Sequence, residues 1–435
     1  MKIIPALYTN RGKLLTGAVN GFLQNTVTIP LAQESGVHCT SLVKKGDVVR
    51  EGDVIAIPDF GSYSSTHAKI HASIPGIVED VISCTCPDGR QENAVRIRMS
   101  GAFSFIGKKL HFNNWNAISP QSLTYTLAEK GVVNTFDTAK PISLATQIDA
   151  LKLNTHKLLV VRLYDDDPDR ITDSLLASAF FDDVKTGALI TASALDADGI
   201  VFVLDAKSPL PDKFDEMHIP IRFVHVDIAE YPAGFREEIM LAVKSSIREE
   251  PFTFISDTSL YVDATTMIAV CNAVQHAIPS IEQYVYVSGE CIPAVGLLKV
   301  CMGTTLRYLA EQCGGLKKQP AAVIVNGLML GTSSGSLDAP VTKYVKSVSF
   351  LPAFRVPKQR QTSCMRCGSC RTVCPRKLSP DVLYRHASGK MREHDEYVRS
   401  SLLCSECGLC NSVCPARLPI CQAIQLLQKE VLKNE

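Results

Sequence analysis

Hydrophobic and polar positions alternate in short runs over the first hundred residues. Val27, Ile29 and Leu31 are separated by small or polar residues, and the segments 43–49 and 50–56 combine β-branched residues with Gly-Asp dipeptides. Short β-branched runs that are interrupted by such turns are typical of β-hairpins. The pattern therefore predicts a β-sandwich for the N-terminal part of the chain.

The apolar runs become longer between residues 120 and 250. Three of them fit buried strands: 158–163, 200–204 and 221–226. Helical patterns lie between the first two, at 174–179 with Asp173 as a candidate N-cap and at 183–195. Strands that alternate with helices indicate an α/β layer with a parallel sheet.

The pattern changes again from residue 251 onward. Helices are expected at 262–277 and 304–312, and strands at 283–288 and 322–325, which fits a compact α+β domain. A polar linker, 357–363, then leads into a cysteine-rich segment, and an amphipathic helix is expected at 420–432.

The cysteine-rich segment carries one motif twice. Both copies read C-x2-C-x2-C-x3-C-P: Cys364, Cys367, Cys370 and Cys374, then Cys404, Cys407, Cys410 and Cys414. This is the spacing of bacterial two-cluster ferredoxins, in which the fourth cysteine of each run binds the other cluster. The spacing predicts two [4Fe–4S] clusters and hence single-electron transfer.

The crossover assigns four ligands to each cluster. The first set is Cys364, Cys367, Cys370 and Cys414, and the second is Cys404, Cys407, Cys410 and Cys374. Gly368 and Gly408 occupy matching positions where the backbone must turn closely around the inorganic core.

Two other interpretations of these cysteines fit less well. Structural zinc sites use two CxxC pairs that are separated by a longer stretch. Disulfides are rare in reducing compartments, and the N-terminus lacks a signal-peptide core. The remaining eight cysteines show no ligand spacing, and Cys421, in the C-terminal apolar helix, is interpreted as a packing residue.

Composition adds limits to this picture. The 435 residues, with 46% hydrophobic and 20% charged residues, predict a globular protein of three or four domains. A net charge of +1 argues against nucleic-acid binding. Residues 355–435 carry a net charge of +7, which either offsets anionic clusters or forms a docking face for an acidic electron carrier. No apolar stretch is long enough to span a membrane, so a cytoplasmic protein is expected.

The order of these segments resembles the RnfC family, the C subunit of the Rnf electron-transport complex, together with microcompartment cobalamin reductases and proline reductase-associated electron-transfer proteins. The resemblance rests on residues 29–56, 262–290 and 302–315, and on the two cysteine runs. It implies a multidomain α+β fold. The implied domains are a barrel-sandwich hybrid at 1–105, a Rossmann-like α/β domain of the NADH dehydrogenase 51 kDa type at 106–250, a soluble-ligand-binding (SLBB) β-grasp domain at 251–352, and an α-helical dicluster ferredoxin domain at 353–435.

One segment departs from the family pattern. Members that bind FMN and NADH carry a glycine-rich loop whose amides approach the flavin phosphate. The corresponding stretch here keeps Gly131 and Lys140, the candidate FMN residues, but has lost three glycines and gained Asp137. An acidic patch near the nicotinamide is represented by residues 165–168. Either the α/β domain is a relict without flavin, or it binds flavin by another arrangement.

The leading hypothesis is an RnfC-like oxidoreductase component that relays single electrons from a ferredoxin, a flavoprotein or an NADH-linked donor to a dedicated reductase. The chain would be cytoplasmic, at the periphery of a membrane complex or inside a microcompartment. Two alternatives remain: an FMN-dependent NADH-oxidising reductase, and a docking or assembly protein whose clusters serve structure only.

Overall fold

The computed structural model describes residues 19–59, 66–209, 219–356, 360–389 and 395–433. The N-terminal residues that bear on a signal peptide, and residues 357–359 of the expected linker, lie outside this part of the chain. The chain divides into two compact units, which are considered separately. The first contains residues up to 327 together with 331–353, and the second contains 328–330 and 354–435.

The first unit begins with a β-sandwich, as the alternating pattern predicted. One sheet has the order β2 (Thr26–Pro30), β8 (Gln91–Met99), β7 (Gly76–Thr85) and β4 (Val48–Val49). The other has the order β3 (Cys39–Ser41), β5 (Val54–Pro58) and β6 (Ile70–His71). All of these pairs are antiparallel. Val27, Ile29 and Ile55 are fully buried between the sheets.

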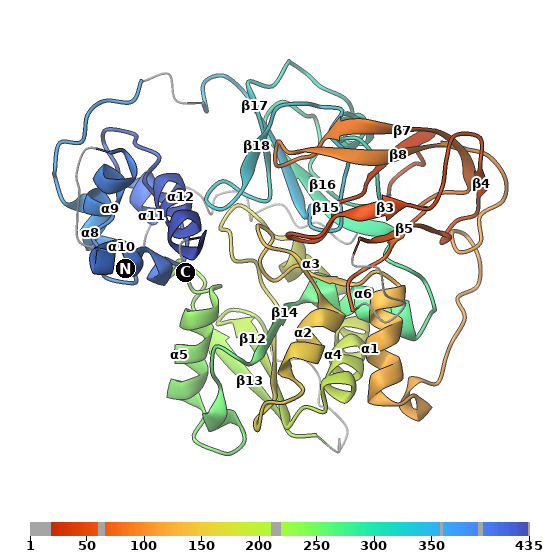
Figure 1. The fold of residues 1–435 in the computed structure, drawn as a ribbon, viewed down its shortest axis with the longest axis horizontal. Coiled ribbons are helices and arrows are strands. Elements are labelled where there is room, and N and C mark those ends of the chain that lie inside the picture. Colours follow the sequence, from red (N-terminus) through yellow and green to blue (C-terminus); the bar gives the residue numbers. More distant parts are fainter. Residues whose placement is uncertain (1–18, 60–65, 210–218, 357–359, 390–394, 434–435) are drawn as a thin grey trace. The chain divides into compact units, whose positions relative to one another are not determined.

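A four-stranded parallel sheet follows, with the order β13 (Ile221–Val226), β12 (Gly199–Asp205), β11 (Leu158–Arg162) and β14 (Leu260–Asp263). Helices cover both faces (Figure 1). One face packs on α1 (Pro120–Glu129), α2 (Leu144–Leu151), α3 (Thr172–Ala179), α4 (Phe181–Leu195) and α6 (Ala264–Val274). The other face packs on α5 (Arg236–Ser246). Leu159 and Val161 face the first core, whereas Leu158 and Val160 face the second, because side chains alternate along a strand.

Three expectations for this region differ from the structure. The boundary expected at residue 250 falls inside the layer, because β14 pairs in parallel with β11 and α6 packs against α4. The helix expected at 262–277 starts only at Ala264, since Asp263 caps it through a hydrogen bond from the Thr266 amide. Asp173, expected as an N-cap, lies within the first turn of α3, and its carboxylate accepts instead from Thr265.

The rest of the first unit is a mixed six-stranded sheet. Its order is β1 (Val19–Asn20), β16 (Gly296–Cys301), β15 (Glu282–Ser288), β19 (Ser347–Leu351), β17 (Ala322–Val325) and β18 (Thr332–Ser334). The strands expected at 283–288 and 322–325 are confirmed. Helix α7 (Leu306–Gln312) packs Leu306 and Leu309 on this sheet, and Thr305 caps its N-terminus. A short pair, β9 (Val133–Asn134) and β10 (Ile142–Ser143), precedes α2.

The second unit is helical, as expected. Its helices are α8 (Ser369–Thr372), α9 (Pro380–Ala387), α10 (Asp395–Arg399), α11 (Leu409–Ser412) and α12 (Ile420–Lys433). The amphipathic pattern at 420–432 is confirmed by α12, which packs on α9 and buries Ile424 and Leu427. Among the described residues of the whole chain, no helix is both long and apolar enough to cross a bilayer.

Candidate functional site

The two cysteine motifs adopt the same local backbone. Gly368 and Gly408, with φ of 77° and 73°, begin the short helices α8 and α11. Arg366 and Glu406 share a left-handed φ just before them, as do Lys377 and Arg417 just after the fourth cysteines. The glycines are suited to this conformation because they lack a Cβ. The repeat in sequence is therefore also a repeat in structure.

The first of two cavities is lined by cysteines from both motifs. Cys364, Cys367 and Cys370 come from the first motif and Cys414 from the second. The space between its walls, open solvent included, is about 380 Å³, and the wall is completed by Tyr384, Leu418, Ile420 and Asp381, among others. The structure thus brings together the four residues that the crossover rule assigns to one cluster.

The second cavity mirrors the first. Cys404, Cys407 and Cys410 come from the second motif and Cys374 from the first, around a space of about 340 Å³, open solvent included. Leu378, Pro380, Leu409 and Ile424 contribute apolar wall. A fifth cysteine, Cys421, also lines this cavity. The interpretation of Cys421 as a packing residue was therefore incomplete, because its side chain is part of the α9–α12 core and also faces the cysteine cavity.

The chemistry of these cavities fits an iron–sulfur cluster. Each brings together the four thiols of one crossover set around a space lined largely by apolar side chains, and thiolates are the ligands of such clusters. Burial raises the pKa of the Cys407 thiol to about 11, whereas a hydrogen bond with Ser369 lowers the pKa of the exposed Cys367 thiol. Bound metal deprotonates coordinating thiols, so filling the site is expected to release protons.

The residues that correspond to the family's flavin loop are far from the cysteine motifs in the sequence and belong to the first unit. Gly131 is buried with φ of 71°, and its carbonyl accepts a hydrogen bond from Lys343 Nζ at 2.8 Å. A Cβ at Gly131 would lie 2.3 Å from the Lys69 carbonyl oxygen, so close packing against the protein's own backbone accounts for this glycine. Lys140 is exposed.

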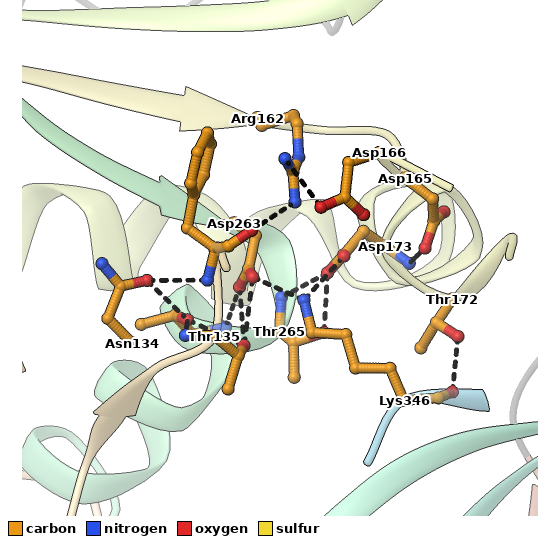
Figure 2. A network of polar contacts seen from close by, with 12 residues as sticks. Asn134, Thr135, Arg162, Asp165, Asp166, Thr172, Asp173, Asp263, Thr265 and Lys346 are labelled. Carbon is orange, nitrogen blue, oxygen red and sulfur yellow. Dashed lines mark hydrogen bonds and ion pairs between the residues drawn. The ribbon is translucent and has the colours of Figure 1, made fainter. Parts of the chain in front are cut away.

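The loop between them is held by the protein's own polar groups. The Thr135 amide donates to Thr266 Oγ1 at 3.0 Å, and the Phe136 amide donates to Asn134 Oδ1 at 3.0 Å. The Thr135 hydroxyl donates to Asp263 at 3.0 Å (Figure 2). The backbone amides of Thr135 and Phe136, which lie in the stretch that corresponds to the phosphate-binding loop, thus already donate to oxygens of the protein.

Figure 2 shows that this loop continues into a buried network of charges. Lys346 Nζ bonds Asp173 at 2.8 Å and Asp263 at 2.5 Å, and all three side chains are fully buried. Lys346 and Arg162 oppose the cost of burial and hold the pKa of Asp263 down, at about 2. Sequence reasoning missed this network, because Lys346 and its two partners come from distant parts of the chain.

The acidic patch at 165–168 belongs to the same network. Asp165 accepts from Arg170 Nε at 3.0 Å and from the amides of Asp173 and Ser174 at the start of α3. Asp166 pairs with Arg162 and Arg170. These carboxylates therefore have structural partners within the chain.

Comparison with known proteins supports the same picture. The family model for the RnfC barrel sandwich hybrid domain matches residues 18–102, and the model for the 4Fe-4S dicluster domain matches residues 355–418. The C subunit of the proton-translocating ferredoxin:NAD(+) oxidoreductase complex of Clostridium ljungdahlii is 27% identical over 83% of this chain and 78% of its own length.

Two further relatives are similar. The C subunit of the ion-translocating oxidoreductase complex of Rhodobacter capsulatus is 25% identical over 81% of this chain and 68% of its own length. The C subunit of the Na(+)-translocating ferredoxin:NAD(+) oxidoreductase complex of Acetobacterium woodii is 22% identical over 81% of this chain and 79% of its own length. An NAD+-reducing [NiFe]-hydrogenase in the air-oxidised state matches 74% of this chain and 64% of its own, with 15% identity and a TM-score of 0.48, too distant to carry an argument.

The N-terminal domain, the cysteine cavities and these relatives lead to one assignment. The chain is an iron–sulfur electron-transfer protein that is similar to RnfC subunits.

Proposed function

We propose that this chain relays single electrons through two [4Fe–4S] clusters. Cys364, Cys367, Cys370 and Cys414 would hold one, and Cys404, Cys407, Cys410 and Cys374 the other. The observation that carries the proposal is that each cavity takes three cysteines from one motif and the fourth from the other. This sharing ties the two sites into one folded unit and keeps them adjacent.

The clusters would supply one-electron chemistry, and the protein would supply their surroundings. Apolar side chains such as Leu378 and Ile424 limit contact with water at the second site. Water exclusion and hydrogen bonds to sulfur are among the factors that set a cluster's potential. The surroundings that the protein supplies thus help to set the reduction potentials of the clusters, and hence which donors can reduce them.

We further propose that the candidate FMN residues, Gly131 and Lys140, bind no flavin in this chain. Three observations support this proposal. The amides of Thr135 and Phe136 already donate to protein oxygens, Asn134 and Thr135 fill the space beside them with paired side chains, and the adjoining charge belongs to Asp263. A phosphate there would meet a carboxylate and would need those bonds to break. Hydride transfer from NADH then has no acceptor in this chain.

The electrons must therefore come from and go to other proteins. The similar proteins named above are subunits of ferredoxin:NAD(+) or ion-translocating oxidoreductase complexes. We propose that this chain is likewise a peripheral component of a redox complex and exchanges electrons with a ferredoxin, a flavoprotein or a dedicated reductase. The net charge of +7 on residues 355–435 suits an acidic carrier.

The domain assignments are part of this proposal. We propose that the parallel sheet is a Rossmann-like domain of the NADH dehydrogenase 51 kDa type that now serves structure, and that the six-stranded sheet is an SLBB β-grasp domain. Because β14 and α6 belong to the parallel layer, the boundary between these two domains would follow α6 rather than residue 250.

The test is anaerobic purification followed by assays of iron, acid-labile sulfide and flavin. We expect about eight irons per chain without flavin. Reduced ferredoxin should reduce the clusters, whereas NADH alone should not. Stoichiometric FMN together with NADH-driven cluster reduction would favour a reductase instead. Clusters that cannot be reduced and reoxidised reversibly would indicate a scaffold.

A further inference from the structure

The two halves of the cluster unit differ at one pair of matching positions. Asp381 and Cys421 each follow the fourth cysteine of their own motif at the same spacing, just inside α9 and α12. Asp381 lines the first cavity and Cys421 lines the second. The internal repeat therefore places a carboxylate beside one set of cysteines and a thiol beside the other.

The carboxylate at the first site is already hydrogen-bonded to an arginine. Arg371 Nε and Nη2 donate to the two oxygens of Asp381 at 2.6 and 2.9 Å. Two charge-assisted hydrogen bonds from one guanidinium occupy both oxygens, so the side chain has no proton to donate. The first cavity thus has an ion pair at its edge and receives no proton from the Asp381 side chain, although the Asp381 backbone amide hydrogen-bonds the Cys370 sulfur.

The equivalent pair at the second site is neutral. Asn411 occupies the position of Arg371, and its Oδ1 accepts from the Cys421 backbone amide at 2.8 Å. Asn411 Nδ2 donates to Gln422 at 2.7 Å. These bonds fix the first turn of α12 and leave the Cys421 thiol, which is 5% exposed, in the wall of the second cavity together with Cys404 and Cys410.

We propose that Cys421 is a hydrogen-bond donor to the thiolates of the second cluster and raises the reduction potential of that cluster above the value it would have without this donor. The inference rests on the proposed function, since it needs two clusters. Cys374, Cys404, Cys407 and Cys410 already supply four thiolates, the number a cubane cluster binds. A fifth thiol at the same cavity therefore keeps its proton and can donate it to a neighbouring sulfur.

The direction of the effect follows from charge. Reduction adds negative charge to the cluster and its thiolates, and a hydrogen-bond donor to sulfur stabilises the more negative state. At this position the first cluster receives no side-chain donor, because both oxygens of the Asp381 carboxylate accept from Arg371. The exchange of Asp381 for Cys421 therefore makes the two halves of the repeated unit electronically different at this position.

The test is a redox titration of the full chain, followed by electron paramagnetic resonance, with three variants at residue 421. In Cys421→Ala, one of the two reduction steps should move to a lower potential while the other stays. Cys421→Ser, whose hydroxyl still donates, should keep the step close to that of the unmodified protein. Both variants should retain about eight irons. Cys421→Val controls for filling of the cavity and should behave like Cys421→Ala.

A reciprocal experiment uses the matching position. Asp381→Cys and Asp381→Ala both remove the carboxylate, and only the first adds a thiol. We expect the other reduction step to lie at a higher potential in Asp381→Cys than in Asp381→Ala. Equal potentials in these two variants would overturn the proposal.

The potentials and the iron content of Cys421→Ala also test the proposal. Unchanged potentials in Cys421→Ala would overturn the hydrogen-bond role, and loss of about four irons would show that Cys421 is a ligand. Absence of clusters from the unmodified protein would instead defeat the proposed function itself. The iron content thus separates failure of this inference from failure of the assignment on which it rests.

Discussion

Cys374 lies in the same cavity as Cys404, although the two residues belong to different motifs. Cys414 is likewise placed with Cys364 rather than with the cysteines of its own motif. Each site therefore depends on both halves of the repeat. Damage to one motif is expected to affect a cluster whose other ligands are intact.

This arrangement predicts the effect of Cys374→Ala. The variant removes one thiolate from the second site, so the iron content should fall from about eight to about four per chain, with one reduction step lost. Cys313→Ala is the control, because Cys313 is buried in the core of the six-stranded sheet and lines neither cavity. Loss of the first cluster rather than the second would contradict the crossover.

The buried charge network predicts a strong effect of Lys346→Met. Without the ammonium group, Asp173 and Asp263 would both be buried beside each other with no cation between them. Removal of one partner of a buried ion pair costs about 3–5 kcal/mol. Thermal unfolding followed by circular dichroism should show a marked loss of stability. Lys109→Met, at an exposed position, should have little effect, and an equally stable Lys346→Met would contradict the role of the network.

His71 predicts a dependence of stability on pH. Burial, and to a smaller extent Lys343, lower the pKa of His71 to about 3. The unfolded chain, with a histidine pKa near 6.5, therefore binds a proton that the folded chain rejects. The contribution of His71 to the stability of the fold is fully present above pH 6.5 and is lost as the pH falls toward 3.

The expected loss between pH 7 and pH 5 is about 2 kcal/mol from this residue. Urea unfolding at both pH values should detect it. His71→Asn, which cannot bind the proton, should show a smaller difference between the two pH values. An identical pH dependence in both proteins would refute the contribution of His71.

The close packing of α4 on α6 predicts that Gly187→Ala lowers the free energy of unfolding. A Cβ there would lie 1.9 Å from the Met267 carbonyl oxygen, so the helices must separate to admit it. Overpacking of a core costs about 1–3 kcal/mol, and a clash with backbone lies at the upper end. Gly335→Ala is the matched control, since no atom lies within 4 Å of its added Cβ. Differential scanning calorimetry of the two variants gives the comparison.

Several features could be predicted from the sequence because their causes are local. Val27 and Ile29 alternate with polar residues and form β2, and the uninterrupted run at 158–162 forms β11, buried on both faces. The spacing of the cysteines led to the correct grouping of eight side chains into two cavities. In each case the signal lies within a few residues, and the backbone period or the loop geometry converts it into structure.

Other features required the tertiary structure. The sequence from residue 262 was expected to be helical, and only the pairing of Leu260 with Leu159 shows that 260–263 is a strand of the parallel layer. The matching positions of Asp381 and Cys421 can be found by aligning the two motifs, yet the alignment does not show that both face a cavity.

The sequence by itself therefore predicted that this chain carries iron–sulfur ligands and resembles the RnfC family. The tertiary structure decided that the flavin-type loop is occupied by paired side chains, and that Lys346 neutralises Asp173 and Asp263. The physical reason is that a buried polar group must find a partner wherever the fold supplies one. That partner, such as Lys346 for Asp173, comes from a part of the chain that no local pattern connects to it.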